Sequence, residues 1–383
     1  MSDVLIKNCK LYNKLNDGLF DILIDGKSIT KIQKKIETDN NVAVIDAKSK
    51  IAMPGFIDVH IQGAGGADIL DNTVEALQKM SQTLAATGTT GFLGTTVVKP
   101  IENNEHLKLA REFTNKNLGG AVMLGVHLEG PFINVKKKGG LAPESIYQSS
   151  SEKLEEILNV TNGSLKMMTI APELKGNLDV IKELIKNNVV PSFAHSDASY
   201  EETKRGFDAG INHVTHIFNA MPPFHHRNPS PLSAIFESKT VTAQIISDGH
   251  HLHPSAVKMV YKILGQQRIV CITDGVQGIG LPDGRYTYNG KEYDSVAGAA
   301  RYLDGTLIGS TTSLGNIAKK FKEFTGCTFE EAINSVSINP AKVLGIDNKK
   351  GSLENGKDAD IVLADEDFSI FMTFVEGKIS FQI

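Results

Sequence analysis

The sequence predicts an α/β protein: a (β/α)₈ TIM barrel with a small β-sandwich domain built from both chain ends. Three observations support this prediction. Eight short apolar runs alternate with helix-length segments between residues 54 and 345, both chain ends carry only short β-like runs, and 383 residues suffice for one large domain and a small one. A doubly wound open sheet is the alternative interpretation of the same alternation.

Residues 1–53 and 346–383 are predicted to form the accessory β-sandwich domain. Turn signals such as Asp25-Gly26 separate short β-like runs in both of these regions. Because a two-stranded fragment is only marginally stable alone, we expect the two chain ends to pair with each other. The runs cover residues 4–6, 20–24, 359–364 and 373–378.

Residues 54–345 are predicted to form the barrel, because segments with helical periodicity separate its apolar runs. Two of these segments, 73–87 and 199–209, begin with a threonine and a serine, residue types that cap helices. The eight expected strands cover residues 56–61, 91–98, 123–129, 165–171, 189–194, 213–217, 241–248 and 269–274.

An insertion at residues 281–310 interrupts the last strand-to-helix connection. It contains three turn pairs, Asp283-Gly284, Asn289-Gly290 and Asp304-Gly305, which are typical of β-hairpins. We therefore expect a hairpin flap on the rim of the barrel.

Composition excludes several classes of protein. Lys and Arg number 40 against 44 Asp and Glu, and the longest basic run is only Lys136-Lys137-Lys138, so a nucleic-acid partner is not expected. An 18-residue apolar run is missing from the sequence, so neither a membrane span nor a signal peptide is expected, and we predict a cytoplasmic protein. The three cysteines are far apart and are expected to be reduced.

Three of the expected strands end on residues that bind metals. Glu129, His195 and His216 follow the third, fifth and sixth runs, and parallel barrel strands bring their carboxyl ends to one rim. Carboxylate and imidazole suit a divalent ion such as Zn²⁺ or Fe²⁺, and three protein ligands leave a position for water. Taken singly, each residue could instead be an ordinary hydrogen-bonded, salt-bridged or capping group.

Asp274 is expected to end the eighth strand, at the same rim. A carboxylate there could take a proton from a metal-bound water and return it to a leaving amine. The alternative is a helix cap. His60 and Gln62 end the first strand, and with Asp274 they form a candidate second metal site, although Gln62 weakens it where two-metal hydrolases often have His-x-His.

Two loops on the rim contain candidate substrate-binding residues. Arg227 with His226 beside it, after the sixth strand, suits an anion such as phosphate, although a solvated surface loop would look the same. His251, after the seventh strand, is placed to touch substrate. The alternatives for His251 are adventitious metal binding and exposure to solvent.

The motifs of this chain occur in an order that resembles the N-acetylglucosamine-6-phosphate deacetylase family of the amidohydrolase superfamily. The resemblance covers essentially the whole chain, and the ordered set is specific although each motif alone is weak. The motifs are Pro54-Gly55-Phe56-Ile57-Asp58-Val59-His60, His127-Leu128-Glu129-Gly130-Pro131, Ala171-Pro172-Glu173, His195-Ser196-Asp197-Ala198, Thr215-His216-Ile217-Phe218-Asn219-Ala220-Met221, Ser247-Asp248-Gly249-His250-His251, Thr273-Asp274 and Asp304-Gly305-Thr306-Leu307-Ile308-Gly309-Ser310.

The resemblance implies a divalent metal, Zn²⁺ or Fe²⁺, on the Glu129, His195 and His216 set, with one ion per subunit and Asp274 as acid/base. It also implies sugar contacts from Asn219, Ala220 and His251. Arg227 would hold the phosphate of a neighbouring subunit's substrate, so a homodimer is expected. The expected substrate-binding set also includes Leu141, His226 and Ser310.

Two positions depart from the pattern that the resemblance implies. His60-x-Gln62 is intermediate between relatives with His-x-His and relatives that lack both, which leaves the metal count open. Leu141 stands where members commonly have a polar residue, often histidine, directed at the substrate. Because leucine cannot hydrogen-bond an acyl carbonyl, either the loop shifts, the metal alone polarises that oxygen, or the substrate differs.

The predicted activity is metal-dependent hydrolysis of the acetamide of N-acetyl-D-glucosamine 6-phosphate, giving glucosamine 6-phosphate and acetate. The alternative enzyme removes the acyl group from another substrate, such as N-acetylgalactosamine 6-phosphate. The alternative of another class is a catalytically inactive binding protein on the same fold.

Overall fold

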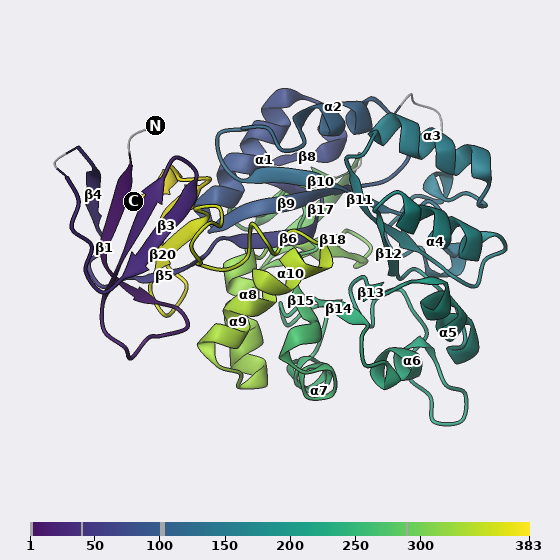
Figure 1. Ribbon diagram of the computed structural model, residues 1–383. Helices are drawn as coiled ribbons and strands as arrows, with labels where there is room; N and C mark the ends of the chain where they lie inside the picture. Colours follow the sequence, from purple (N-terminus) through teal and green to yellow (C-terminus); the bar gives the residue numbers. More distant parts are fainter. Residues whose placement is uncertain (1–2, 40, 100–103, 289) are drawn as a thin grey trace.

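The computed structural model describes residues 3–39, 41–99, 104–288 and 290–383, and a closed barrel dominates it (Figure 1). Its eight strands are parallel neighbours in the order β15-β14-β13-β12-β11-β10-β9-β6, and a parallel bridge between Ile61 and Gly275 joins the two ends of the sheet. The eight predicted strands are thereby confirmed, and the open sheet is excluded. They are β6 Phe56–Ile61, β9 Thr89–Thr96, β10 Val122–Glu129, β11 Leu165–Ile170, β12 Val190–Phe193, β13 His213–Val214, β14 Thr242–Ile245 and β15 Ile269–Cys271.

Helices surround this sheet and bury its outer face (Figure 1). The two segments with predicted caps form α1 and α5, which the side chains of Thr73 and Ser199 cap at their amino ends. Each strand is therefore covered on both faces, which explains why β9 and β10 are buried at every residue. The helices are α1 Val74–Ala86, α2 Glu105–Phe113, α3 Ser151–Thr161, α4 Asn177–Lys186, α5 Tyr200–Ala209, α6 Pro231–Glu237, α7 Pro254–Leu264, α8 Leu314–Thr325, α9 Phe329–Ser335 and α10 Ile338–Val343.

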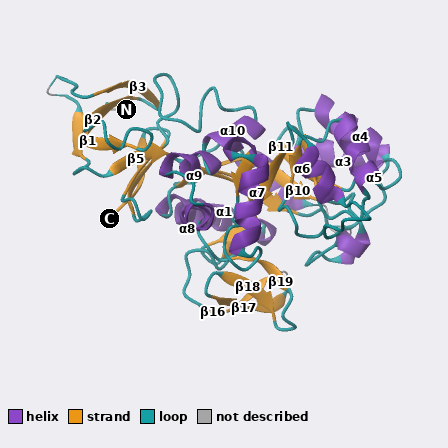
Figure 2. Ribbon diagram, turned by 90° about the horizontal axis from the view of Figure 1, so that it is seen from below, coloured by secondary structure: helices purple, strands orange, loops and turns teal. Residues whose placement is uncertain are grey.

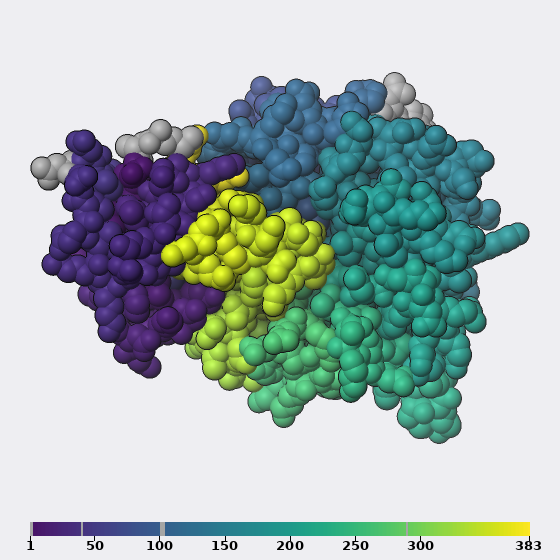
Figure 3. All heavy atoms as spheres, in the orientation of Figure 1, coloured from purple at the N-terminus to yellow at the C-terminus, as the bar shows by residue number. Residues whose placement is uncertain are grey.

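The two chain ends share a second sheet beside the barrel, as predicted. Strand β20 pairs antiparallel with β5, so residues more than 300 positions apart are neighbours. Figure 3 shows the C-terminal segment in contact with both the N-terminal sheet and the barrel. This sheet has its own apolar core, around Ile22 and Phe374. Its strands are β1 Val4–Leu11, β2 Phe20–Asp25, β3 Ser28–Gln33, β4 Ala43–Asp46, β5 Ile51–Pro54, β20 Ile361–Ala364, β21 Ile370–Val375 and β22 Lys378–Gln382.

The insertion after β15 forms a four-stranded antiparallel flap that projects from the barrel (Figure 2). Its strands are β16 Gly284–Tyr288, β17 Lys291–Val296, β18 Ala299–Tyr302 and β19 Leu307–Ser310, and a two-residue ribbon, β7 Gly63–Ala64 with β8 Ala67–Asp68, lies after β6. The pair Asp304-Gly305 turns between β18 and β19 as predicted, whereas Gly284 opens β16. Asn289, of the predicted turn pair Asn289-Gly290, lies outside the described residues. Ala297 and Gly298, both at positive φ, make the turn between β17 and β18.

None of the helices in the part of the chain that the structure describes is long and apolar enough to cross a membrane.

Candidate active site

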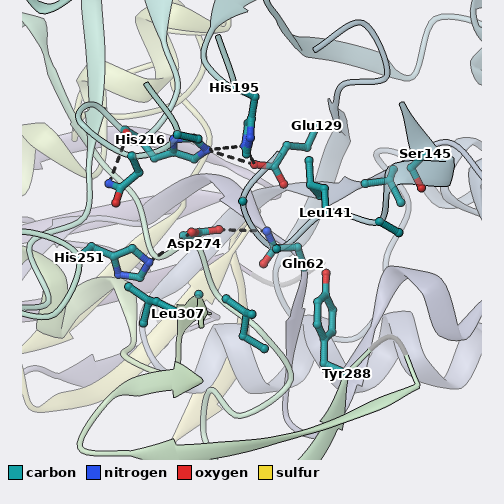
Figure 4. Close-up of a pocket in the computed structure, with 18 of the residues that line it drawn as sticks. Gln62, Glu129, Leu141, Ser145, His195, His216, His251, Asp274, Tyr288 and Leu307 are labelled. Atoms are coloured by element: carbon teal, nitrogen blue, oxygen red, sulfur yellow. Dashed lines mark hydrogen bonds and ion pairs between the residues drawn. The ribbon is translucent and has the colours of Figure 1, made fainter. Parts of the chain in front are cut away.

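Three side chains meet at the carboxyl-terminal rim of the barrel (Figure 4). Glu129 is the last residue of β10, while His195 and His216 follow β12 and β13. Oε1 of Glu129 lies 2.8 Å from Nε2 of His195 and 3.1 Å from Nε2 of His216, and the two Nε2 atoms are 3.1 Å apart. All three residues are buried, and together they form a group able to hold a metal ion.

The backbone at this rim adopts conformations that side chains usually avoid. His195, His216 and Asp274 have positive φ values of 48°, 30° and 49°. Left-handed backbone costs free energy for residues with a Cβ and is concentrated at functional sites. The chain thus leaves the extended conformation just after these strands, where the three side chains face the site.

The chemistry of the donor set fits a cation. Nδ1 of His195 lies 2.7 Å from the carbonyl oxygen of Lys137, which only accepts, so Nδ1 carries the proton and Nε2 of a neutral ring presents a lone pair. That lone pair faces a Glu129 oxygen, which also only accepts when ionised. A divalent ion between these atoms removes the conflict, and Zn²⁺ and Fe²⁺ both take such ligands.

Asp274 lies beside this group and contacts several side chains. Its Oδ1 accepts a 3.0 Å hydrogen bond from Nε2 of Gln62 and lies 3.2 Å from Nε2 of His60. Its Oδ2 lies 3.5 Å from Nε2 of His251, whose Nδ1 is 2.6 Å from Oδ2 of Asp248. The structure thus brings together His60, Gln62 and Asp274, the candidate second metal site, and places His251 beside them.

Charge balance within the site keeps the carboxylates ionised. Burial alone would raise the pKa of Asp274, but the charge of His60 and the hydrogen bonds from His251 and His60 outweigh it and hold the pKa well below its usual range. Burial would lower the pKa of His251, but Asp248 and Asp274 raise it to about 9. Asp274 is therefore ionised at neutral pH, which is the state that a proton acceptor must have.

A pocket with a cavity volume of about 200 Å³ opens over these residues. A concave site with a few convergent polar groups is typical of small-molecule binding. Asn219, Ala220 and His251 lie on its wall together with Leu141, so the loop that carries Leu141 does not turn away from the pocket. The roles assigned to these residues stay predictions.

Three residues of the predicted substrate-binding set lie away from this pocket. Arg227 and His226 are exposed on the loop after β13, with the guanidinium 2.8 Å from the His226 ring. Ser310 lies behind Asp274, where its N–H donates a 2.9 Å hydrogen bond to the Asp274 carbonyl oxygen. Ser310 therefore supports the position of Asp274, and its direct contact with substrate stays a prediction.

Two residues at the site had no assigned role in the sequence. Asp248 orients His251, and the Asp-x-x-His spacing was a usable signal because both residues lie in one short motif. Tyr288 reaches the pocket from the flap, where a tyrosine in a hairpin gives no signal of its own. Its position depends on how the flap folds back over the barrel.

Comparison with known proteins gives a consistent result over nearly the whole chain. The model of the amidohydrolase family matches residues 51–380. The chain is 35% identical over 361 residues to the N-acetylglucosamine-6-phosphate deacetylase of Bacillus subtilis (strain 168), covering 93% of this chain and 91% of that protein. It is 34% identical over 340 residues to the N-acetylgalactosamine-6-phosphate deacetylase of Escherichia coli O157:H7, covering 88% and 90%.

A solved structure is similar as well. A mutant N-acetyl-D-glucosamine-6-phosphate deacetylase from Mycobacterium smegmatis, in complex with N-acetyl-D-glucosamine-6-phosphate, superposes with a TM-score of 0.90 at 26% identity. The match covers 99% of this chain and 100% of that chain. Both the barrel and the sheet of the chain ends are therefore common to the two proteins.

Proposed function

Because this chain belongs to the amidohydrolase family, we propose that it hydrolyses the acetamide of N-acetyl-D-glucosamine 6-phosphate, giving glucosamine 6-phosphate and acetate. The observation that carries this proposal is the Glu129, His195 and His216 group with Asp274 beside it at the base of one pocket. Amide hydrolysis needs an activated water and a proton donor for the leaving amine, and this arrangement supplies groups for both.

Glu129, His195 and His216 would hold one divalent ion, Zn²⁺ or Fe²⁺. When bound, such an ion supplies Lewis-acid polarisation of the acyl oxygen and lowers the pKa of water. Glu129 contributes a negative charge, because the nearby His195, His216 and His60 outweigh the effect of burial and hold the pKa of its carboxyl well below the usual range. Lys137 fixes the ring orientation of His195 through its carbonyl oxygen.

Asp274 moves the proton. Its ionised carboxylate accepts a proton from the attacking water, and the same proton passes to the amine nitrogen as the C–N bond breaks. His251 contacts the sugar and is held by Asp248, while Gln62 fixes the Asp274 carboxylate from the other side.

Recognition of the phosphate is assigned to Arg227 and His226 of a neighbouring subunit in a homodimer. Both side chains are exposed and lie outside this chain's own pocket, which is compatible with a role in another subunit's site. A guanidinium binds phosphate with two parallel hydrogen bonds. We further propose that the enzyme acts in the cytoplasm.

A second candidate substrate is N-acetylgalactosamine 6-phosphate. The E. coli relative named for that activity is 34% identical to this chain, against 35% for the B. subtilis relative, so overall identity does not separate the two sugars. They differ only in the orientation of one hydroxyl group, and the N-acyl group that reacts is the same.

The test is an acetate-release assay on both sugar phosphates and on unphosphorylated N-acetylglucosamine. The metal is first removed by chelation, and the protein is refilled separately with Zn²⁺ and Fe²⁺. We expect fast release from N-acetylglucosamine 6-phosphate, slower release from its epimer and little from the unphosphorylated sugar. No acetate from any of them in any metal form would contradict the proposed function and support a binding protein.

A further inference from the structure

Tyr288 places a hydroxyl group in the pocket from the flap. It is the last residue of β16, and it lines both the main pocket and a smaller void beside it. Figure 4 shows its hydroxyl oxygen directed toward Gln62 and Leu141. The flap is joined to the barrel at the site itself, because Ser310 at the end of β19 donates a 2.9 Å hydrogen bond to the Asp274 carbonyl oxygen. Tyr288 is thus presented from a side that the barrel strands do not supply.

The pocket wall near Tyr288 lacks the polar group expected at position 141. Leu141 lines both the pocket and the void, with apolar neighbours that include Leu70 and Val97. The amide N–H of Gln62 is already donated to Asp274. The Tyr288 hydroxyl makes no hydrogen bond to any described residue, so it is available to a substrate atom.

The void beside Tyr288 leaves room around this hydroxyl. It has space for about one water molecule. Two of its lining residues, Gln62 and Thr96, each have a buried side-chain oxygen, Oε1 and Oγ1, with no hydrogen-bond partner among the described residues. Unpaired buried polar atoms favour a polar guest over an empty void.

The orientation of the substrate indicates which atom Tyr288 meets. His251 and Tyr288 lie on opposite sides of Asp274 in Figure 4. If His251 contacts the sugar and Asp274 faces the scissile amide, the acyl group points away from His251, toward Leu141 and Tyr288. We propose that Tyr288 positions the acyl group by donating a hydrogen bond to its carbonyl oxygen. Tyr288 thus takes the role of the polar residue expected at position 141, where this chain has leucine.

The proposal rests on the proposed function, and the protonation of Tyr288 agrees with it. Burial, followed by the charges of Asp68 and Glu129, raises the pKa of Tyr288 well above its usual range. The phenol therefore remains a donor over the pH range in which Asp274 is ionised. A donor aimed at the acyl oxygen gains strength as negative charge develops there in the transition state.

The experiment compares Tyr288→Phe with the wild-type holoenzyme on N-acetylglucosamine 6-phosphate. Because the lost contact is strongest in the transition state, kcat/KM should fall about tenfold to a hundredfold, mainly through kcat. Inhibition by glucosamine 6-phosphate, which has no acyl group, should be unchanged. A disturbed flap would instead weaken binding of the product as well. Tyr302→Phe, which removes a hydroxyl from β18 of the same flap, is the matched control and should retain wild-type kinetics.

A second variant tests the exchange of roles between the two positions. Adding Leu141→His to Tyr288→Phe restores a polar side chain on this wall, and it should recover several-fold of the lost kcat. If Tyr288→Phe stays within about twofold of wild type, or if it weakens product binding as much as kcat, the acyl contact is absent. Wild-type enzyme that releases no acetate would overturn the proposed function, and this inference with it.

Discussion

Gln62 donates a 3.0 Å hydrogen bond to Oδ1 of Asp274 across the base of the pocket. The contact joins the end of the first barrel strand to the end of the eighth, two strands that are adjacent only because the barrel closes. It holds one carboxylate oxygen with a neutral donor, while the other oxygen lies near His251.

Replacing Asp274 with asparagine removes the proton acceptor and keeps the shape of the side chain. General acid–base catalysis contributes about 10²–10⁴-fold, so kcat should fall by a similar factor. The metal content should match the wild type, because Glu129, His195 and His216 remain. Steady-state acetate release and elemental analysis of the same sample measure both quantities. Turnover close to wild type would show that another group carries the proton.

Replacing Gln62 with histidine creates a second candidate ligand group. His60 already lies 3.2 Å from Asp274, and an imidazole at position 62 would add a lone pair where an amide N–H now points. We expect the bound metal per chain to rise above the wild-type value in elemental analysis after dialysis. Gln62→Asn, which adds no imidazole, is the matched control. An unchanged stoichiometry in Gln62→His would mean that residues other than Gln62 limit the site to one ion.

The strand ends and the polar residues that follow them could be predicted from the sequence for a physical reason. A barrel strand covered on both faces appears as an unbroken apolar run, so the polar residue that ends it, such as Glu129, stands out. The unpredicted features depend on contacts between distant segments. Tyr288 reaches the pocket only because the flap folds back, and Ser310 lies behind Asp274 because β19 bridges to Gly275. Hairpin geometry gives no indication of where a flap will dock.

Arg227→Ala should chiefly raise KM for the sugar phosphate. The phosphate is remote from the reacting bond, so its contacts stabilise the bound substrate and the transition state equally. Loss of a charged hydrogen-bond pair predicts a rise of about tenfold to a hundredfold. The assay is a substrate titration on N-acetylglucosamine 6-phosphate, with unphosphorylated N-acetylglucosamine as the control substrate. An unchanged KM would remove Arg227 from phosphate recognition.

Co-expression of Arg227→Ala with Asp274→Asn tests whether the arginine acts between subunits. A mixed dimer has one site with an intact Asp274 and a partner's intact arginine, so activity at low substrate should exceed that of either variant alone. If the arginine serves its own chain, neither site of the mixed dimer is complete. The purified mixed dimer would then be no more active than the variants.

His213 makes the stability of the fold depend on pH. It is fully buried on β13, with Nδ1 2.7 Å from Thr242 Oγ1 and Nε2 3.1 Å from the side-chain nitrogen of Gln244. Burial, and then the charge of His60, lowers its pKa to about 3 from the ordinary histidine value of 6.5. Below pH 6.5, His213 therefore binds a proton in the unfolded chain but not in the folded chain.

The free energy of unfolding should accordingly be highest above pH 6.5 and decrease toward pH 3, by at most about 1.4 kcal/mol per pH unit from this residue. His213→Gln should be less stable near neutral pH, because it disturbs the contacts with Thr242 and Gln244, but its stability should decrease less steeply on acidification. Urea unfolding at a series of pH values measures both effects, with the exposed His226 replaced by glutamine as the control. Equal slopes for wild type and His213→Gln would mean that other buried groups, His127 among them, carry the proton uptake.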